Sequence, residues 1–204
     1  MLSLGMDIGT STVKLVLLRD GAMAKQWMAV HHGRPFACLK KGLSALELDA
    51  DTPFSLCVTG SNTEALLEQA PDIPSFGDIP AVVEGVRQIV PQAGSVIEIG
   101  SQGARFITDL QSRAPQFSVN EHCAGGTGSF FEDQMSRVGC RLGDYSSLVE
   151  QAQSVPRLSG RCAVFAKTDI IHRQQEGVST PDILLGLCYA MIRNYKATIV
   201  RRLP

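Results

Sequence analysis

Two segments of the chain share one form: an apolar strand, a turn of glycine and small polar residues, and a second strand. They are MDIGTSTVKLVLL, which begins at Met6, and SVIEIGSQGARFITDL, which begins at Ser95. In each, an acidic residue and Ile-Gly precede the turn, and a basic residue follows it. Strands that are apolar on both faces are typical of a sheet with both sides covered. We interpret the two segments as an internal repeat and predict an α/β fold.

A turn of this composition can bind the phosphates of a nucleotide. Small residues let backbone N–H groups approach oxygen anions, and a nearby carboxylate can hold Mg²⁺ or a water that bridges to the phosphates. The alternative is a pair of plain hairpins, with Asp7 and Glu98 solvated at the strand ends. The candidate residues are Asp7, Gly9, Thr10, Ser11, Thr12 and Lys14 in the first turn, and Glu98, Gly100, Ser101 and Gln102 in the second.

A third glycine-rich turn carries a cysteine. It lies in NEHCAGGTGSFFE, Asn120 to Glu132, and leads into a segment with helical spacing. A helix N-terminus attracts anions and favours the thiolate form of a cysteine, so Cys123 is a candidate ligand of iron or zinc, or a nucleophile. His122 is adjacent but is not a persuasive base, because neighbouring side chains often point apart. The small residues of this turn are Gly125, Gly126, Thr127 and Gly128.

A second cysteine, Cys162, has a comparable setting after Gly160, at the edge of the apolar segment CAVFA. Two thiolates make half of a four-thiolate site, and a two-fold dimer would complete it by presenting the same patch twice. The sequence leaves open that both cysteines are buried structural thiols. The chain's six cysteines form no C-x-x-C pair, which excludes zinc-ribbon and thioredoxin motifs.

The composition is that of an ordinary globular protein. The 204 residues are 44% hydrophobic and 19% charged, with a formal net charge of −1. This balance gives no global electrostatic attraction to nucleic acid or to a membrane surface. No apolar run reaches the roughly 18–20 residues that span a bilayer. We therefore expect a cytoplasmic protein with neither nucleic acid nor a membrane as a partner.

The remaining segments predict further strands and helices. Asp20-Gly21 is a hairpin signal, and the next strand is expected to follow it. Strands are expected at 24–33 and from 54 to Gly60, and a short helix or turn at 63–71. Helices are expected at 40–53, 79–91, 128–139 and 144–154, and a strand that becomes helical at 162–177.

The C-terminal part of the chain is expected to be helical. The change of character near 112–118 suggests two subdomains, 1–116 with both phosphate hairpins and 117–204 with the cysteines. The last helix is expected over 180–203, where Thr180 can serve as its cap before Pro181 and Asp182.

Four motifs together resemble one protein family. DIGTSTVK, EIGSQGAR, NEHCAGGTGSFFE and GRCAVFAKTDIIH, in this order, are similar to motifs of the ATP-dependent activators of 2-hydroxyacyl-CoA dehydratases. The same family includes ATPase subunits of benzoyl-CoA reductase and belongs to the acetate and sugar kinase/Hsp70/actin superfamily. The resemblance covers nearly the whole chain, and the cysteine motifs are its most specific part.

The resemblance implies a ribonuclease-H-like α/β fold with two subdomains around a nucleotide cleft. It implies ATP and Mg²⁺ as ligands, with Asp7 the Mg²⁺-associated acid and Glu98 and Gln102 further catalytic residues. Gly125 to Gly128 are then backbone on the nucleotide side. It also implies a homodimer that shares one [4Fe-4S] cluster held by Cys123 and Cys162 of each protomer. ATP hydrolysis would then send one electron to a 2-hydroxyacyl-CoA dehydratase-like acceptor.

This chain departs from the family at its second turn. The family's usual DIGGQDSK has become EIGSQGAR, so Glu98 replaces aspartate, Ser101 replaces glycine and Arg105 replaces lysine. The longer acid moves the carboxylate by roughly 1.5 Å, and a shift near 1 Å can cost on the order of 10²-fold in rate. The segment Thr59 to Asn62 also lacks the family's usual aromatic residue. These changes favour nucleotide binding over efficient hydrolysis.

Three functional hypotheses follow. The first is the ATP-coupled electron-transfer activator, an ATPase if it is active. The second is a degenerate nucleotide-binding or interaction module of the same fold. The third, a small-molecule kinase, ranks last because it leaves the cysteine turn unexplained. The family continues past this last helix, so we also expect the chain to be an N-terminal piece of a longer relative, without its C-terminal part.

Overall fold

The computed structural model describes residues 1–49, 51–120, 126–160 and 162–203. Its contacts divide the chain into two compact units, Met1–Pro91 and Gln92–Pro204. The predicted boundary between residues 116 and 117 differs from this division. It falls at the start of strand β7 (Gln116–Val119), which pairs with its neighbour inside the second unit.

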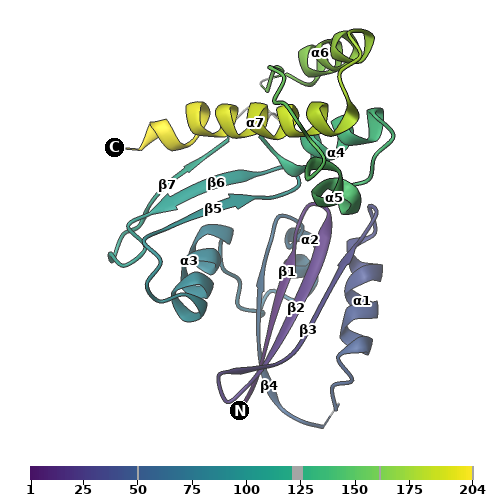
Figure 1. Ribbon diagram of the computed structural model, residues 1–204. Helices are drawn as coiled ribbons and strands as arrows, with labels where there is room; N and C mark the ends of the chain where they lie inside the picture. The colour runs from purple at the N-terminus through teal and green to yellow at the C-terminus, as the bar shows by residue number, and fades with distance from the viewer. Residues whose placement is uncertain (50, 121–125, 161, 204) are drawn as a thin grey trace. The chain divides into compact units, whose positions relative to one another are not determined.

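The first unit is built on a four-stranded sheet of order β3-β2-β1-β4 (Figure 1). β1, β2 and β3 form antiparallel pairs, and β4 is parallel to β1. Alternate side chains of β1 and β2, among them Met6, Ile8 and Leu15, are buried, and α1 packs on them through Cys38 and Leu39. The elements are β1 (Leu2–Ile8), β2 (Thr12–Arg19), β3 (Ala22–Val30), α1 (Pro35–Ala45), β4 (Phe54–Thr59), α2 (Glu64–Gln69) and α3 (Asp78–Ile89).

Local sequence explains where these elements begin and end. Asp20 and Gly21 have φ of 51° and 82°, the left-handed values of a two-residue hairpin turn, which confirms the predicted hairpin. The helix predicted at 40–53 is wrong in its bounds, because Pro35 begins α1 at its first position. Glu47 has a φ of 49°, which is incompatible with continuing the helix.

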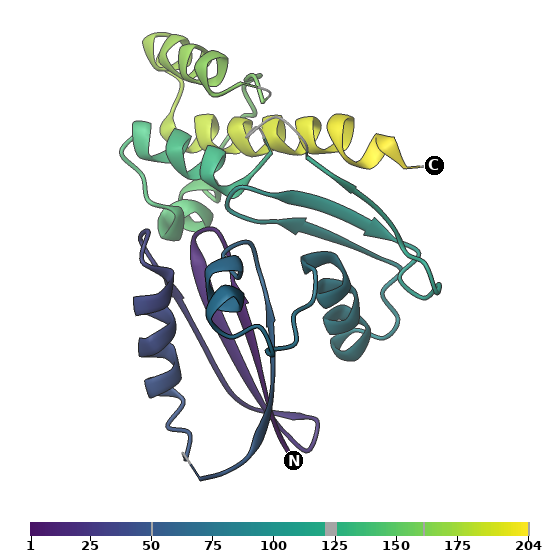
Figure 2. The same cartoon turned by 180° about the vertical axis from the view of Figure 1, so that it is seen from behind.

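The second unit combines a three-stranded antiparallel sheet, β5-β6-β7, with helices. Ala104 of β6 is buried against Tyr195 and Ile199, at the end of the chain's longest helix, α7, which runs along this sheet (yellow in Figure 2). No helix within the described ranges is long and apolar enough to cross a membrane. Besides β7, the second unit contains β5 (Ser95–Ile99), β6 (Ala104–Thr108), α4 (Gly128–Arg137), η1 (Leu142–Asp144), α5 (Tyr145–Val149), α6 (Ala163–Gln175), α7 (Thr180–Thr198) and η2 (Val200–Arg202).

The second unit differs from the sequence-based predictions in three places. Strand β7 was not predicted, and it occupies the stretch interpreted as a domain boundary. The segment 162–177 has no strand at its start, because α6 begins at Ala163. The cap of α7 is Ser179 rather than Thr180: its hydroxyl accepts a hydrogen bond from the N–H of Asp182 at 3.3 Å.

The predicted repeat has the same backbone construction in both units. Asp7 of β1 is in register with Lys14 of β2. The corresponding pair in the second unit is Glu98 of β5 with Arg105 of β6, and each of its residues lies 91 positions after its counterpart. The N–H of Gly9 donates to the carbonyl of Thr12 at 2.9 Å. At the same separation of 91 residues, the N–H of Gly100 donates to the carbonyl of Gly103 at 2.7 Å. The two hairpins therefore correspond residue by residue.

Candidate functional site

The first turn presents a carboxylate above a glycine. Asp7 is the second-last residue of β1, and its Oδ2 lies 2.7 Å from Nζ of Lys14 on the facing strand. A Cβ on Gly9 would lie 3.6 Å from Oδ1 of Asp7 and 3.3 Å from the carbonyl oxygen of Thr12, so the space beneath the carboxylate would hold little more than a methyl group. The ion pair is exposed, at 34% for Asp7 and 46% for Lys14, so it stabilises the fold by about 1 kcal/mol or less and both groups can exchange partners.

Two side chains that the sequence did not reveal fix this turn. The carbonyl oxygen of Gly9 accepts hydrogen bonds from Nδ2 of Asn62 at 2.7 Å and from Nε2 of His31 at 3.2 Å. Nδ1 of His31 accepts the N–H of Gly33 at 3.1 Å, which assigns the ring proton to Nε2. No local sequence pattern indicates the contact of Asn62, because it reaches a residue 53 positions away.

The backbone of the first turn keeps a donor available. The Gly9 carbonyl is occupied by Asn62 and His31, and the Gly9 N–H by Thr12. The N–H of Thr10 has no hydrogen-bond partner among the described residues, and the Thr10 side chain is exposed. A fixed turn with an unused N–H beside hydroxyl groups and a cation can bind an anion.

The second turn has the same hairpin geometry as the first, but its acidic side chain, Glu98, is held by an arginine. Nη1 of Arg105 donates to both carboxylate oxygens of Glu98, at 3.0 and 2.9 Å. The pair is more buried than its counterpart in the first turn, at 20% exposure for Arg105 and 32% for Glu98. The Tyr195 hydroxyl donates to the Arg105 carbonyl. Burial, with the Glu98 charge adding to it, raises the pKa of Tyr195 to about 12.

Helix α4 is joined directly to the second turn. The N–H groups of Gly128 and Ser129 donate to the carbonyls of Gly100 and Ser101, both at 2.8 Å, and the hydroxyls of Ser101 and Ser129 lie 2.7 Å apart. A Cβ on Gly128 would lie 3.1 Å from the Gly100 oxygen, which explains the glycine.

The next N–H of α4 is also used within the protein, because Phe130 donates to Oγ1 of Thr127 at 3.4 Å. The first three amides of this helix are therefore engaged by the fold, although the sequence suggested them for an anion. A contact of Gly126, Thr127 or Gly128 with a nucleotide stays a prediction.

Cys123 and Gly125 lie outside the described residues, but the flanks of their segment are anchored. Asn120 extends the β6–β7 pairing: its N–H donates to the Ala104 carbonyl at 3.0 Å, and its Oδ1 accepts the Ala104 N–H at 2.6 Å. The Asn120 side chain thus accepts the Ala104 N–H in the pairing of these two residues. Beyond the segment, Gly126 has a φ of 97°, and a Cβ there would lie 3.5 Å from Nδ2 of the buried Asn194 on α7.

Cys162 is anchored on the same helix. A Cβ on Gly160 would lie 2.1 Å from the carbonyl oxygen of Ala190, so the backbone before Cys162 rests directly on α7. Ala190 and Asn194 are about one turn apart, roughly 6 Å along the helix. Cys162 occupies the cap position of α6, half-buried, as a free thiol whose side chain caps nothing. Within the described ranges, no group of three or more His, Cys, Asp or Glu side chains is arranged to hold a metal.

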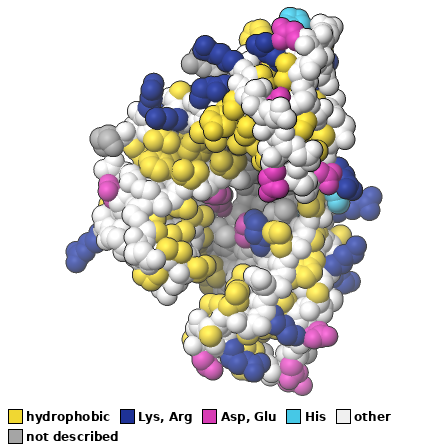
Figure 3. All heavy atoms as spheres, viewed as in Figure 1, with side chains coloured by type: hydrophobic (Ala, Val, Ile, Leu, Met, Phe, Trp, Pro, Cys, Tyr) yellow, Lys and Arg dark blue, Asp and Glu magenta, His cyan; other side chains and the backbone are white. Residues whose placement is uncertain are grey.

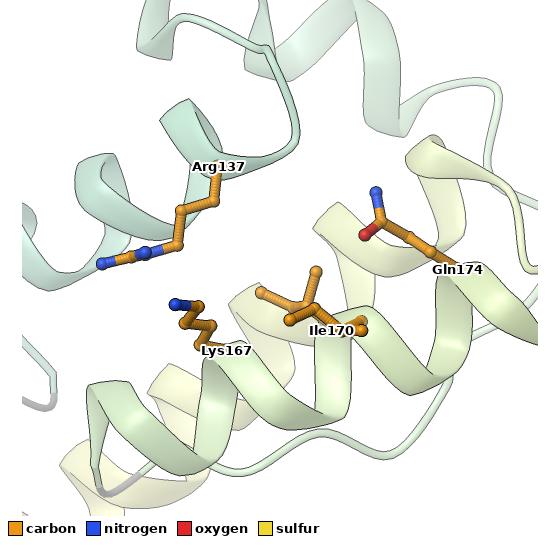
Figure 4. A pocket seen from close by; sticks show the side chains of 5 residues that line it. Arg137, Lys167, Ile170 and Gln174 are labelled. Atoms are coloured by element: carbon orange, nitrogen blue, oxygen red, sulfur yellow. The ribbon is translucent and has the colours of Figure 1, made fainter.

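A separate pocket of about 210 Å³ lies between α4 and α6 (Figure 4). Arg137 and Lys167 point into the same space from the two helices, and Ile170 and then Gln174 follow Lys167 along α6. Arg137 is held by Asp133, with Nε 3.1 Å from Oδ2. None of the residues predicted from the sequence lines this pocket.

Comparisons with known proteins identify relatives of this chain. The model of the BadF/BadG/BcrA/BcrD ATPase family matches residues 4–203. The activator of lactoyl-CoA dehydratase of Anaerotignum propionicum is 30% identical over 192 residues, which cover 92% of this chain and 73% of that protein. One of the subunits of benzoyl-CoA reductase from Thauera aromatica is 28% identical over 197 residues, covering 92% of this chain and 68% of that protein.

Two solved structures share the fold. Component A of (R)-2-hydroxyglutaryl-CoA dehydratase from Acidaminococcus fermentans superposes with a TM-score of 0.87 at 22% identity, covering 100% of this chain and 79% of that one. The activator of 2-hydroxyisocaproyl-CoA dehydratase from Clostridium difficile, solved with bound ADPNP, gives a TM-score of 0.87 at 24% identity, covering 100% and 76%. These likenesses confirm the predicted actin-like α/β fold.

Proposed function

Because the chain belongs to the BadF/BadG/BcrA/BcrD ATPase family, we propose that it binds ATP with Mg²⁺ and activates an acyl-CoA dehydratase of the kind named for its relatives. The finer proposal is that ATP hydrolysis drives an electron, through an iron–sulfur cluster, to that acceptor enzyme. The observation that carries the proposal is the first turn, where the exposed Asp7 carboxylate, the Thr10 N–H and Lys14 lie together.

We assign the binding of the nucleotide phosphates to the first turn. Carboxylate and hydroxyl oxygens suit Mg²⁺, so Asp7 and the hydroxyls of Thr10, Ser11 and Thr12 fit the ion directly or through water. Mg²⁺, when bound, neutralises the charge of the phosphates. Lys14 can leave Asp7 for a phosphate oxygen, because an exposed ion pair costs about 1 kcal/mol or less to open.

The second turn, through Gly100, Ser101 and Gln102, is assigned further contacts with the nucleotide. Gln102 is exposed, and its amide can orient an attacking water. Glu98 can act on that water only if Arg105 releases it, since Arg105 occupies both carboxylate oxygens. This observation favours a second candidate function: a module of the same fold that binds nucleotide without efficient hydrolysis.

Cys123 and Cys162 are assigned to a [4Fe-4S] cluster shared by a homodimer. The free, half-buried thiol of Cys162 suits an iron ligand, and the backbone before it packs against α7 through Gly160. The cluster, when bound, supplies one-electron chemistry. This chain would supply two thiolates per protomer, and α7 would hold the segment before Cys162 in place.

Phosphate release from Mg-ATP tests the nucleotide assignment. We expect Asp7→Asn to lower the rate at least ~10-fold, because a contact to a charged group contributes about 1.5–3 kcal/mol. Asp72→Asn, which neutralises an exposed acid in the same unit, should match the wild type. Nucleotide binding without phosphate release would select the binding module instead, and equal rates in all three proteins would refute the role of Asp7.

Anaerobic iron–sulfur reconstitution tests the cluster. The wild type should turn brown and bind about four irons per dimer. Cys162→Ser should retain less than half of that iron, whereas Cys140→Ser, at another half-buried free thiol, should retain all of it. A colourless wild-type protein would refute the cluster while leaving the nucleotide site standing.

A further inference from the structure

The pocket between α4 and α6 combines two cations with an apolar wall. It has a volume of about 210 Å³ and is lined by Arg137 of α4 and by Lys167, Ile170, Ile171 and Gln174 of α6. The four α6 residues are spaced i, i+3, i+4 and i+7, so they form one stripe along that helix. The charged ends of Arg137 and Lys167 point into the same space from the two helices (Figure 4). None of these five residues belongs to the nucleotide or cluster assignments above.

The guanidinium of Arg137 is held in place by its own helix. Its Nε and Nη2 donate to Oδ2 and Oδ1 of Asp133, at 3.1 and 3.4 Å. Oδ2 of Asp133 also accepts a hydrogen bond from Nε2 of Gln134 at 2.8 Å, and Gln134 is fully buried. Asp133 therefore fixes one edge of the guanidinium. The Nη1 group on the other edge has no partner among the described residues and can donate to a ligand.

Lys167 has no counterpart of Asp133. Its Nζ makes neither an ion pair nor a hydrogen bond with the part of the chain that the structure describes. Two cations that point into one space repel each other, and an anion bound between them removes this repulsion. Because Asp133 neutralises one of the two cations, the described side chains give the pocket a formal charge of +1.

The attraction of this pocket for an anion is local. The whole chain has a formal net charge of −1, and basic and acidic side chains are interspersed over the face shown in Figure 3. No broad basic surface on that face draws anions, so the two cations of the pocket must hold the ligand. Beside them lie Ile170, which is 2% exposed, and Ile171, which is 41% exposed. These isoleucines favour a ligand with a hydrocarbon part over a bare inorganic ion.

We propose that the pocket between α4 and α6 binds a short-chain aliphatic carboxylate. The carboxylate accepts hydrogen bonds from Nη1 of Arg137 and Nζ of Lys167, and the hydrocarbon chain lies on Ile170 and Ile171. One negative charge matches the charge of the pocket, whereas a dianion such as inorganic phosphate would bring a charge without a partner. Gln174 follows Lys167 by seven residues, about 10 Å along α6, which limits the length of the ligand.

Butyrate is the probe, and its binding is followed by titration calorimetry and by the NMR signals of the isoleucine methyl groups. We expect a dissociation constant on the order of 1 mM, with shifts of the Ile170 and Ile171 signals. Butyramide, which has the same shape without the charge, should bind at least ~10-fold more weakly. Acetate is shorter by two methylene groups and should bind up to about 15-fold more weakly, since each buried methylene contributes up to about 4-fold.

Two variants test the two halves of the pocket. Lys167→Gln removes an exposed cation, so the fold should be kept while butyrate binds at least ~10-fold more weakly. The matched control is Lys196→Gln, at an exposed lysine of α7 that does not line the pocket, and it should bind butyrate like the wild type. Ile171→Ser should reduce the preference for butyrate over acetate and leave the affinity for acetate unchanged.

Four results would overturn the proposal. The first is no shift of the Ile170 and Ile171 signals up to about 10 mM butyrate, and the second is equal binding of butyramide. The third is butyrate affinity that survives Lys167→Gln. The fourth is tighter binding of inorganic phosphate than of butyrate, which would reject the ligand class. None of these outcomes depends on nucleotide or iron, so they leave the proposed function untouched.

Discussion

A methyl group on Gly160 would collide with the backbone of α7. An ideal Cβ there lies 2.1 Å from the carbonyl oxygen of Ala190 and 2.5 Å from its carbonyl carbon. Ordinary C···O contacts are about 3.3 Å, so the two backbones must separate by roughly 1 Å. Ala190 is buried in the interior of α7, and its carbonyl cannot move aside without disturbing the helix. We therefore expect Gly160→Ala to destabilise the fold by about 3 kcal/mol, the upper end of the usual cost of overpacking.

Urea denaturation followed by circular dichroism measures this effect. The matched control is Gly94→Ala, because a Cβ on Gly94 meets nothing within 4 Å. Gly160→Ala should also lower the thermal midpoint by on the order of 10 °C, while Gly94→Ala stays within about 0.5 kcal/mol of the wild type. Equal stability of the two variants would refute the close approach at Ala190, and with it the anchoring of Cys162 on α7.

Three further predictions concern the turns and the pH dependence of stability. Asn62→Ala removes the donor to the Gly9 carbonyl and should lower the free energy of unfolding by about 1–2 kcal/mol in urea titrations; an unchanged value would contradict its buttressing role. The raised pKa of Tyr195, about 12 against an ordinary 10.0, contributes stability that is complete below pH 10 and is lost as the pH rises toward 12. Tyr195→Phe should flatten that decline in denaturation measured from pH 9 to 12, and an unchanged slope would contradict the assignment. The N–H groups of Ser154 and Gln153 lower the pKa of Asp182 below 3.8, so its contribution is present above pH 3.8 and is lost in more acidic solution; Asp182→Asn should remove this acid sensitivity.

Features set by neighbouring residues were predictable from the sequence. The hairpin at Asp20-Gly21 needs a left-handed backbone, which glycine and aspartate adopt readily, so these two adjacent residues are enough to identify it. The acid-Ile-Gly repeat identified both glycine turns as hairpins, because strand, turn and strand are contiguous in the chain. The family's motifs added the fold, which no local pattern specifies.

Features that depend on distant contacts were not predictable. Asn62 reaches Gly9 across 53 positions, and the approach of Gly160 to Ala190 joins a loop to a helix 30 residues further on. Strand β7 is only 4 residues long, too short for alternation to separate it from a loop. The sequence shows that Glu98 stands where the family has aspartate, but it does not show that one Arg105 nitrogen contacts both carboxylate oxygens.

Calorimetric titration with Mg²⁺ and a non-hydrolysable ATP analogue tests the central claim most directly, because it isolates binding from turnover. We predict saturable binding by the wild type, unchanged in Asp72→Asn and weakened by about 10- to 100-fold in Asp7→Asn, the equivalent of 1.5–3 kcal/mol. Equal affinities in Asp7→Asn and the wild type, or no binding by either, would contradict the assignment of the nucleotide phosphates to the first turn.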